Sequence, residues 1–118
     1  MQKAAIIVLA DTDSMEALGR VANALMTVQE FKDAGDEVQL IFDGAGTKWI
    51  GQLSDPQHKY YDVYQRVQDK VGGVCTYCAD AFGVTEQVRA AGAPFADDYQ
   101  GHPSLRQLVS RGYQIITF

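Results

Sequence analysis

Residues 4–17 read AAIIVLADTDSMEA, an apolar run followed by polar residues that favour the start of a helix. The uninterrupted run Ala4–Ala10 is typical of a strand buried on both faces of a parallel sheet. Asp11–Ser14 then supplies side chains that cap helix N-termini. Apolar residues recur every three or four positions as far as Val28, and Gly35 is a helix stop. This strand, turn and helix predict the first half of a βαβ unit.

The rest of the chain continues this alternation of short apolar runs and helical stretches. In chain order we expect a strand at 38–42, an ambiguous segment at 48–53, a helix from Asp55-Pro56 to Gly72-Gly73, a strand at Val74-Cys75, short helices at 78–82 and 85–91, a loop at 93–101, a helix opened by His102-Pro103-Ser104 and a strand at 113–118. The pattern predicts one α/β domain over residues 1–118. It is a three-layer α/β/α arrangement with a largely parallel five-stranded sheet.

Composition narrows the class of protein. The chain has 118 residues, of which 47% are hydrophobic, and a formal net charge of -5. A chain of this length can bury a core without disulfides or metals. The acidic balance offers no basic stripe, so we expect neither nucleic acid nor a membrane as a partner. No apolar run approaches the ~20 residues of a membrane span, and the N-terminus lacks a small-residue cleavage site. We therefore expect a cytoplasmic protein.

The segment Cys75-Thr76-Tyr77-Cys78 holds both cysteines of the chain, three positions apart. Two cysteines are too few for a secreted disulfide scaffold, and they suit redox or sulfur chemistry in a reducing compartment. The pair follows an expected strand, at the edge where α/β sheets bind their ligands. A helix beginning near Cys78 would favour the thiolate, which is the nucleophilic form. A pair at this spacing can also close into a disulfide.

Other interpretations of the pair remain open. Both cysteines could be buried apolar residues, which is a common fate of free cysteine. Zinc needs further ligands, and only His58 and His102 could complete the set, at spacings unlike any zinc finger, so we expect no metal. A thioredoxin-like site would have the pair after the first strand of a βαβ unit, whereas this pair lies far along the chain.

A few other residues are candidates for the site. Lys48 would lower the thiol pKa if its loop lay beside the cysteines, although an exposed loop lysine is the simpler interpretation. His102 is the histidine to test as a base, because its loop returns to the edge of the sheet that holds the cysteines. Asp11 and Asp13 are better interpreted as helix caps than as a metal site. The glycines of Gly44-Ala45-Gly46 lie after the wrong strand for a dinucleotide fingerprint, so no cofactor is expected.

The stretch Val74–Val84, VCTYCADAFGV, together with the N-terminal strand and long helix and the terminal IITF, resembles the DsrE/DsrF-like family of small sulfur-relay proteins. In that family the cysteine that receives and passes on a persulfide sulfur stands eight residues before a glycine, which matches Cys75 and Gly83. Cys78 matches a second cysteine that some members have. The run Asp43–Ile50 is similar to a feature of one branch of the family.

The resemblance implies a flavodoxin-like variant of the α/β fold and a sulfurtransferase-like persulfide carrier. Cys75 would be the nucleophile, and Cys78 would resolve the persulfide as a disulfide. It also implies a homo-oligomer, a trimer or hexamer, with the apolar end Ile115–Phe118 suited to a subunit contact, and partner proteins that donate and accept sulfur. Two alternatives stay open. The protein could be a non-catalytic binding module with structural cysteines, or a thiol-disulfide reductant.

Overall fold

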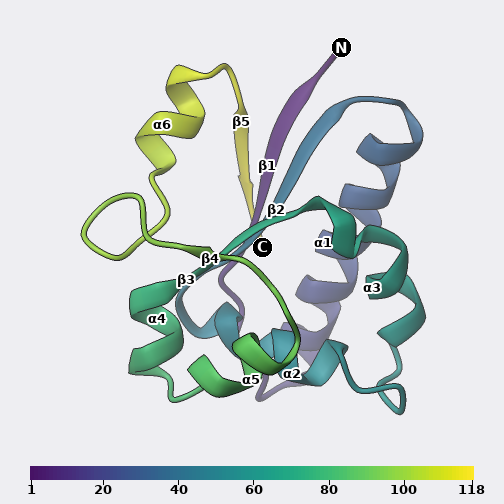
Figure 1. The fold of residues 1–118 in the computed structure, drawn as a ribbon. Helices are drawn as coiled ribbons and strands as arrows, with labels where there is room; N and C mark the ends of the chain where they lie inside the picture. Colours follow the sequence, from purple (N-terminus) through teal and green to yellow (C-terminus); the bar gives the residue numbers. More distant parts are fainter.

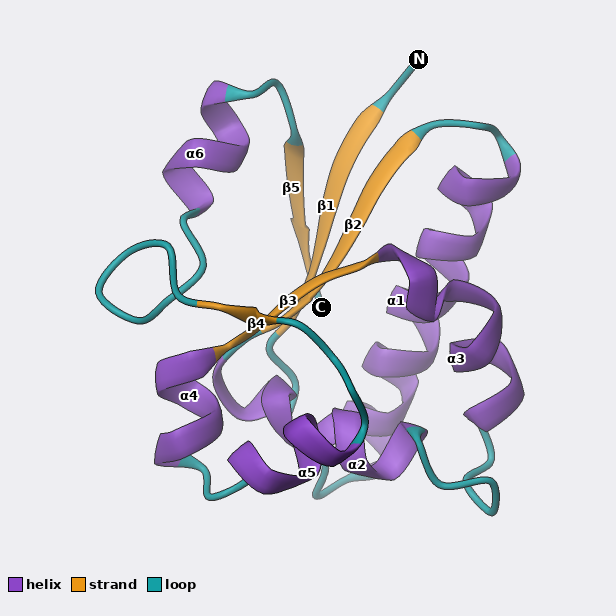
Figure 2. Ribbon diagram, viewed as in Figure 1, coloured by secondary structure: helices purple, strands orange, loops and turns teal.

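The computed structural model describes residues 1–118 as a sheet with helices on both faces (Figures 1 and 2). The strands are β1 (Lys3–Val8), β2 (Glu37–Phe42), β3 (Val71–Cys75), β4 (Phe95–Ala96) and β5 (Gln114–Thr117). They form one five-stranded sheet in the order β4-β3-β2-β1-β5, and every pairing is parallel. The expected α/β fold with a five-stranded parallel sheet is confirmed.

The helices are α1 (Met15–Asp33), α2 (Trp49–Leu53), α3 (Tyr61–Val67), α4 (Thr76–Ala81), α5 (Thr85–Ala90) and α6 (Leu105–Ser110), with 3-10 turns η1 (Gly44–Lys48) and η2 (Gln68–Lys70). Figure 1 shows α1 and α3 on one side of the sheet, α6 on the other, and α2, α4 and α5 gathered at the carboxyl edge of the strands. None of these helices has the length and apolar content needed to cross a membrane.

The core lies mainly on the α1 and α3 side of the sheet. Ile6 and Val8 of β1 belong to this large cluster, whereas Ala5 packs with Leu108 of α6 on the opposite face. Because both faces of β1 are covered, all residues from Ala4 to Val8 are buried. This explains why the strand is an unbroken apolar run without alternating polar residues.

The segment after β2 packs tightly against the end of β1. A Cβ atom on Gly46 of η1 would lie 2.0 Å from the Val8 carbonyl oxygen, so no other residue fits there without moving backbone. The following helix, α2, also contacts the segment after β1, because the buried Trp49 indole donates a hydrogen bond of 2.9 Å to the Ala10 carbonyl. These contacts fix the carboxyl edge of the sheet between β1 and β2.

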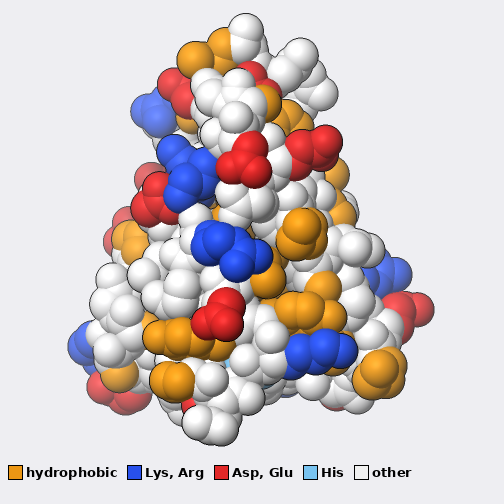
Figure 3. All heavy atoms as spheres, turned by 90° about the vertical axis from the view of Figure 1, so that its right-hand side faces the viewer, with side chains coloured by type: hydrophobic (Ala, Val, Ile, Leu, Met, Phe, Trp, Pro, Cys, Tyr) orange, Lys and Arg blue, Asp and Glu red, His pale blue; other side chains and the backbone are white.

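One lysine connects α1 to the end of α3 and to η2 on the outer face. The Lys32 ammonium donates to the Arg66 carbonyl at 2.7 Å and to the Asp69 carboxylate at 2.8 Å. This pairing with Lys32 lowers the pKa of Asp69. Figure 3 shows the face that includes α1 and α3, where basic and acidic side chains lie interspersed with apolar ones. Exposed pairs of this kind contribute little to stability, so the covered apolar face holds α1 in place.

Three sequence predictions were wrong between β2 and α6. The helix expected from Asp55-Pro56 begins only at Tyr61, since the preceding residues form turns, and it ends at Val67. Gly72-Gly73 is not a helix stop but lies inside β3. A Cβ atom on Gly73 would come within 2.5 Å of the Ala96 side chain, so the glycine is required by the close neighbouring strand. That strand, β4, lies in the segment expected to be a loop.

A tight turn returns the chain from β4 towards the sheet edge. Tyr99 and His102 exchange two backbone hydrogen bonds of 2.8 Å, and the two residues between them, Gln100 and Gly101, have φ of 52° and 83°. Positive φ at both central positions defines a type I′ turn. Ser104 then caps α6 by accepting a hydrogen bond from the Gln107 amide at 3.1 Å. The turn and the cap together fix the position of His102.

We expect Gly46→Ala to destabilise the protein by about 3 kcal/mol or more, because its methyl group would collide with the Val8 backbone. The matched control is Gly19→Ala in α1, where nothing lies within 4 Å of the new Cβ. That change should stabilise the fold by about 1 kcal/mol. Urea denaturation of both variants measures the difference. Equal effects at the two positions would contradict the close approach of η1 to β1.

We expect Gln100→Asn to stabilise the fold by about 0.5–1 kcal/mol, because Asn-Gly is the dipeptide that best tolerates positive φ at both positions of a type I′ turn. Gln100 is the only residue other than glycine with positive φ. Chemical denaturation checks the change, with the exposed Gln52→Asn in α2 as a control that should not stabilise. A destabilised Gln100→Asn variant would mean that the turn has another conformation.

Candidate functional site

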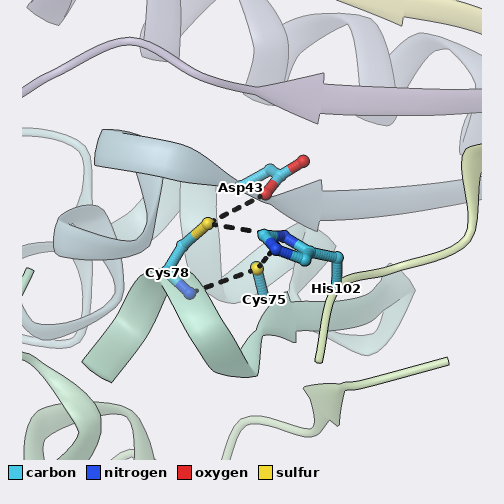
Figure 4. A group of neighbouring side chains, drawn as sticks. All are labelled: Asp43, Cys75, Cys78 and His102. Atoms are coloured by element: carbon cyan, nitrogen blue, oxygen red, sulfur yellow. Dashed lines mark hydrogen bonds between the residues drawn. The ribbon is translucent and has the colours of Figure 1, made fainter. Parts of the chain in front are cut away.

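Four side chains converge at the carboxyl edge of the sheet: Asp43, Cys75, Cys78 and His102 (Figure 4). Their carboxylate, thiol and imidazole atoms all lie within 4.8 Å of one another. They come from four separate places in the fold, namely the end of β2, the end of β3, the first turn of α4 and the turn after β4. The sequence prediction that the cysteines stand at the carboxyl end of a strand agrees with this position.

Both cysteines are free thiols that lie at the junction of β3 and α4. Cys75 is the last residue of β3 and the N-cap of α4, and its sulfur accepts a hydrogen bond of 3.3 Å from the Cys78 backbone amide. Cys75 is completely buried, and Cys78 is 9% exposed. Their spacing of three residues therefore places both sulfurs on the inner side of the first helical turn.

His102 provides the basic group of the cluster. Its Nδ1 atom lies 3.3 Å from the Cys75 sulfur and 3.9 Å from the Cys78 sulfur. The half-buried ring lies beside the exposed Tyr77 ring, with the centroids 4.8 Å apart. Tyr77 also donates a backbone hydrogen bond of 2.9 Å to Gly101 in the neighbouring turn. The structure thus brings the histidine singled out in the sequence into contact with the thiols.

Asp43 belongs to the cluster, and sequence reasoning missed it as a site residue. Its Oδ1 atom accepts a hydrogen bond of 2.9 Å from the Gly44 amide and one of 3.4 Å from the Cys78 thiol. The signal that could have identified it is its position directly after β2. Phe42 pairs with Val74, so the next residues along the two strands, Asp43 and Cys75, are neighbours.

The environment of Cys75 favours the thiol over the thiolate. Burial raises the pKa of Cys75 to about 12, and the hydrogen bond with the Cys78 thiol and the charge of Asp43 act in the same direction. The Cys78 amide lowers the pKa but does not compensate for burial. The start of the helix does favour the thiolate, as expected, through the Cys78 amide, but burial outweighs this effect. A reaction at Cys75 needs a base to take its proton, and His102 is the base in contact with it.

Lys48 and Asp11 lie outside this cluster. The Lys48 ammonium pairs with the Asp11 carboxylate at 2.8 Å and not with a thiol. This hydrogen bond lowers the pKa of Asp11. The expectation that Asp11 and Asp13 cap α1 was wrong, because Ser14 is the N-cap and accepts a hydrogen bond from the Ala17 amide at 3.0 Å.

His58 and the glycine loop have structural contacts instead. The His58 Nδ1 atom accepts a hydrogen bond of 3.0 Å from the Tyr60 amide, and its ring meets the Trp49 ring edge-on. The segment Gly44-Ala45-Gly46 forms the start of η1. Tyr64 of α3 packs against Phe42 in the core.

The main surface hollows are lined by residues other than the four of the cluster. The thiols lie beneath the surface, and their partners His102 and Asp43 are only partly exposed.

Known proteins resemble this chain along most of its length. The uncharacterised protein MJ0733 of Methanocaldococcus jannaschii is 32% identical over 94 residues, which are 80% of this chain and 76% of that protein. A conserved protein of unknown function from Bacteroides thetaiotaomicron, BT1422, shares the fold with a TM-score of 0.59 at 16% identity, over 97% of this chain and 94% of that chain. The DsrE/DsrF-like family matches residues 2–118. The chain therefore belongs to the DsrE/DsrF-like family.

Proposed function

We propose that the protein is a persulfide sulfur carrier in which Cys75 is the nucleophile and His102 its base. The observation that supports this assignment is the 3.3 Å contact between the Cys75 sulfur and the His102 Nδ1 atom. A buried thiol reacts only after losing its proton, and a neutral imidazole with its proton on Nε2 presents Nδ1 to accept it. Membership of a sulfur-relay family points to the same chemistry.

The loading step conserves atoms and electrons. As His102 takes the proton of Cys75, the Cys75 sulfur attacks the outer sulfur of a donor persulfide. A bond forms between these two sulfurs, and the sulfur-sulfur bond of the donor breaks. The donor leaves as a thiolate and receives the proton from His102. The products are the Cys75 persulfide and the donor thiol, so no external oxidant or reductant is required.

The bound sulfur can leave Cys75 by two routes, and the second route uses Cys78. An acceptor thiol can attack the outer sulfur of the Cys75 persulfide and carry it away, which restores the Cys75 thiol. Alternatively, His102 takes the proton of Cys78, and the Cys78 sulfur attacks the inner sulfur of the persulfide. A Cys75-Cys78 disulfide forms, and the outer sulfur leaves as hydrosulfide, which takes up that proton. The disulfide then needs two electrons from an external thiol reductant. The thiols lie within the 4.8 Å span of the cluster, which supports this second route.

The contacts of the two thiols differ and support different roles. Cys75 contacts a nitrogen that can accept its proton, whereas Cys78 donates its hydrogen bond to the Asp43 carboxylate. We therefore assign loading to Cys75, which has the base in contact, and the step after the sulfur has been bound to Cys78.

Sulfur donor and acceptor proteins belong to this proposal as partners, and so does a homo-oligomer, a trimer or hexamer. In the single chain, Ile116 and Phe118 pack against the core of the same chain. Two exposed aromatic residues neighbour His102: Tyr77, whose ring lies beside it, and Tyr99, which pairs with it through the backbone; they are 60% and 66% exposed. Aromatic side chains at this exposure suit a partner that delivers sulfur past His102.

Incubation with a persulfide donor should add a mass of ~32 Da per sulfur to the native protein, and reductant should remove it. We expect Cys75→Ser to abolish the gain, because it removes the attacking sulfur. Cys78→Ser should retain the gain, because it lacks only the resolving thiol. Intact mass spectrometry measures all three proteins. Equal loading of Cys75→Ser would refute the role of Cys75. A loss of ~2 Da without any sulfur adduct would indicate a disulfide couple instead.

His102→Gln should slow sulfur loading by about 100-fold, because the amide cannot accept the Cys75 proton. The final extent of loading should be unchanged, since the nucleophile remains. Time-resolved intact mass separates the rate from the extent. His58→Gln is the matched control, because His58 lies outside the cluster and its change should leave the rate as it is. A His102→Gln rate equal to that of the control would exclude His102 as the base.

A further inference from the structure

We infer that Asp43, Cys75, Cys78 and His102 also form a binding site for one zinc ion. This inference goes beyond sulfur transfer and stands on the geometry of the four side chains alone. Sequence spacing predicted no metal, because it offered only histidines to complete the pair of cysteines. The structure supplies the missing donor, since strand pairing brings Asp43 to the cysteines and the turn brings His102.

The separations between donor atoms suit a tetrahedral ion. Zinc bonds of ~2.3 Å to sulfur and ~2.0 Å to nitrogen or oxygen place neighbouring ligand atoms about 3.3–3.8 Å apart. The Cys75 sulfur lies 3.3 Å from the His102 Nδ1 atom, the Cys78 sulfur 3.9 Å from that nitrogen, and the Cys78 sulfur 3.4 Å from the Asp43 oxygen. The remaining pairs lie within 4.8 Å. An ion therefore needs only small movements of the side chains.

The types of donor select zinc among the common metal ions. Two thiolates and an imidazole are soft or borderline ligands, whereas magnesium and calcium prefer six or more oxygens. Four protein ligands of the Cys/His/Asp type match a closed tetrahedral site. Binding displaces the two thiol protons, so the ion and four ligands carry a net charge of -1 in place of the two thiols and the Asp43 carboxylate. The positive charge of zinc thus stabilises the buried thiolates, which in the absence of metal form only when a base takes the proton.

Hydrogen bonds and ring contacts from neighbouring residues hold the four ligands in position. The Gly44 amide orients the Asp43 oxygen that faces Cys78, and the Cys78 amide points at the Cys75 sulfur. His102 is fixed by its backbone pairing with Tyr99 and by the Tyr77 ring. Supporting contacts of this kind raise the affinity of metal sites. Because His102 and Asp43 are partly exposed, an ion can enter from their side.

The test begins with the reduced, metal-free protein and zinc chloride. We expect native mass spectrometry to show one bound zinc with the loss of two protons. Cobalt(II) in place of zinc should give the ligand-field absorption of a tetrahedral ion and a sulfur-to-metal charge-transfer band. A protein that binds no zinc, or a cobalt complex with an octahedral spectrum, would overturn the inference.

Variants distinguish this site from weak surface binding. Cys78→Ser and His102→Gln should lower zinc affinity by about 100-fold, and Asp43→Asn by about tenfold. The Asp43→Asn change is not expected to unfold η1, since an amide oxygen still accepts the Gly44 hydrogen bond. His58→Gln and Asp11→Asn are the controls, as both residues lie outside the cluster. If Asp43→Asn and His102→Gln bind zinc as tightly as the controls, the four-ligand site is wrong.

The same samples separate the zinc site from the sulfur carrier. Under the proposed function, bound zinc occupies both thiols and should block the gain of ~32 Da in the persulfide assay. A protein that binds zinc but takes up no sulfur when metal-free supports the zinc site and refutes the carrier. A protein that takes up sulfur but binds no zinc supports the carrier and refutes the zinc site.

Discussion

The pairing of Phe42 with Val74 is the constraint on which the rest of the site depends. Both side chains are completely buried in the main core, so the register of β2 against β3 is set by apolar packing. Neighbouring strands lie about 4.8 Å apart, and the chain leaves both at the same edge. Asp43 and Cys75 are therefore adjacent because of the core and not because of any attraction between them. A register slip of one residue would move these strand residues to the opposite face.

A tight turn, and not strand pairing, places His102 beside the cysteines. The last residue of β3, Cys75, pairs with Ala96 of β4, and the chain then turns back through the left-handed residues Gln100 and Gly101. Gln100 is unfavourable in that conformation, whereas glycine adopts it freely. The turn tolerates this residue because two backbone hydrogen bonds between Tyr99 and His102 close it. The base thus sits on a short, strained segment, while the thiols sit on a strand and a helix.

The cysteines could be found from the sequence because their spacing and their place after a strand are local features. His102 could be named as a candidate, but its distance from Cys75 depends on a turn whose positive φ at Gln100 no residue pattern indicated. Asp43 was missed because its place depends on strand pairing. Gly72-Gly73 was misassigned since a glycine required by a neighbouring strand looks the same in sequence as a glycine that ends a helix.

Sulfur transfer and zinc binding both place negative charge on the buried Cys75 sulfur, and they compensate that charge in different ways. The buried Cys75 sulfur is stable as a thiol, and any reaction that gives it negative charge must supply compensating positive charge. In sulfur transfer His102 supplies it by taking the proton, so the charge is temporary and the imidazole must be free. In zinc binding the ion supplies it permanently and also occupies His102. The two chemistries therefore exclude each other, and under both proposals only the metal-free protein can accept sulfur.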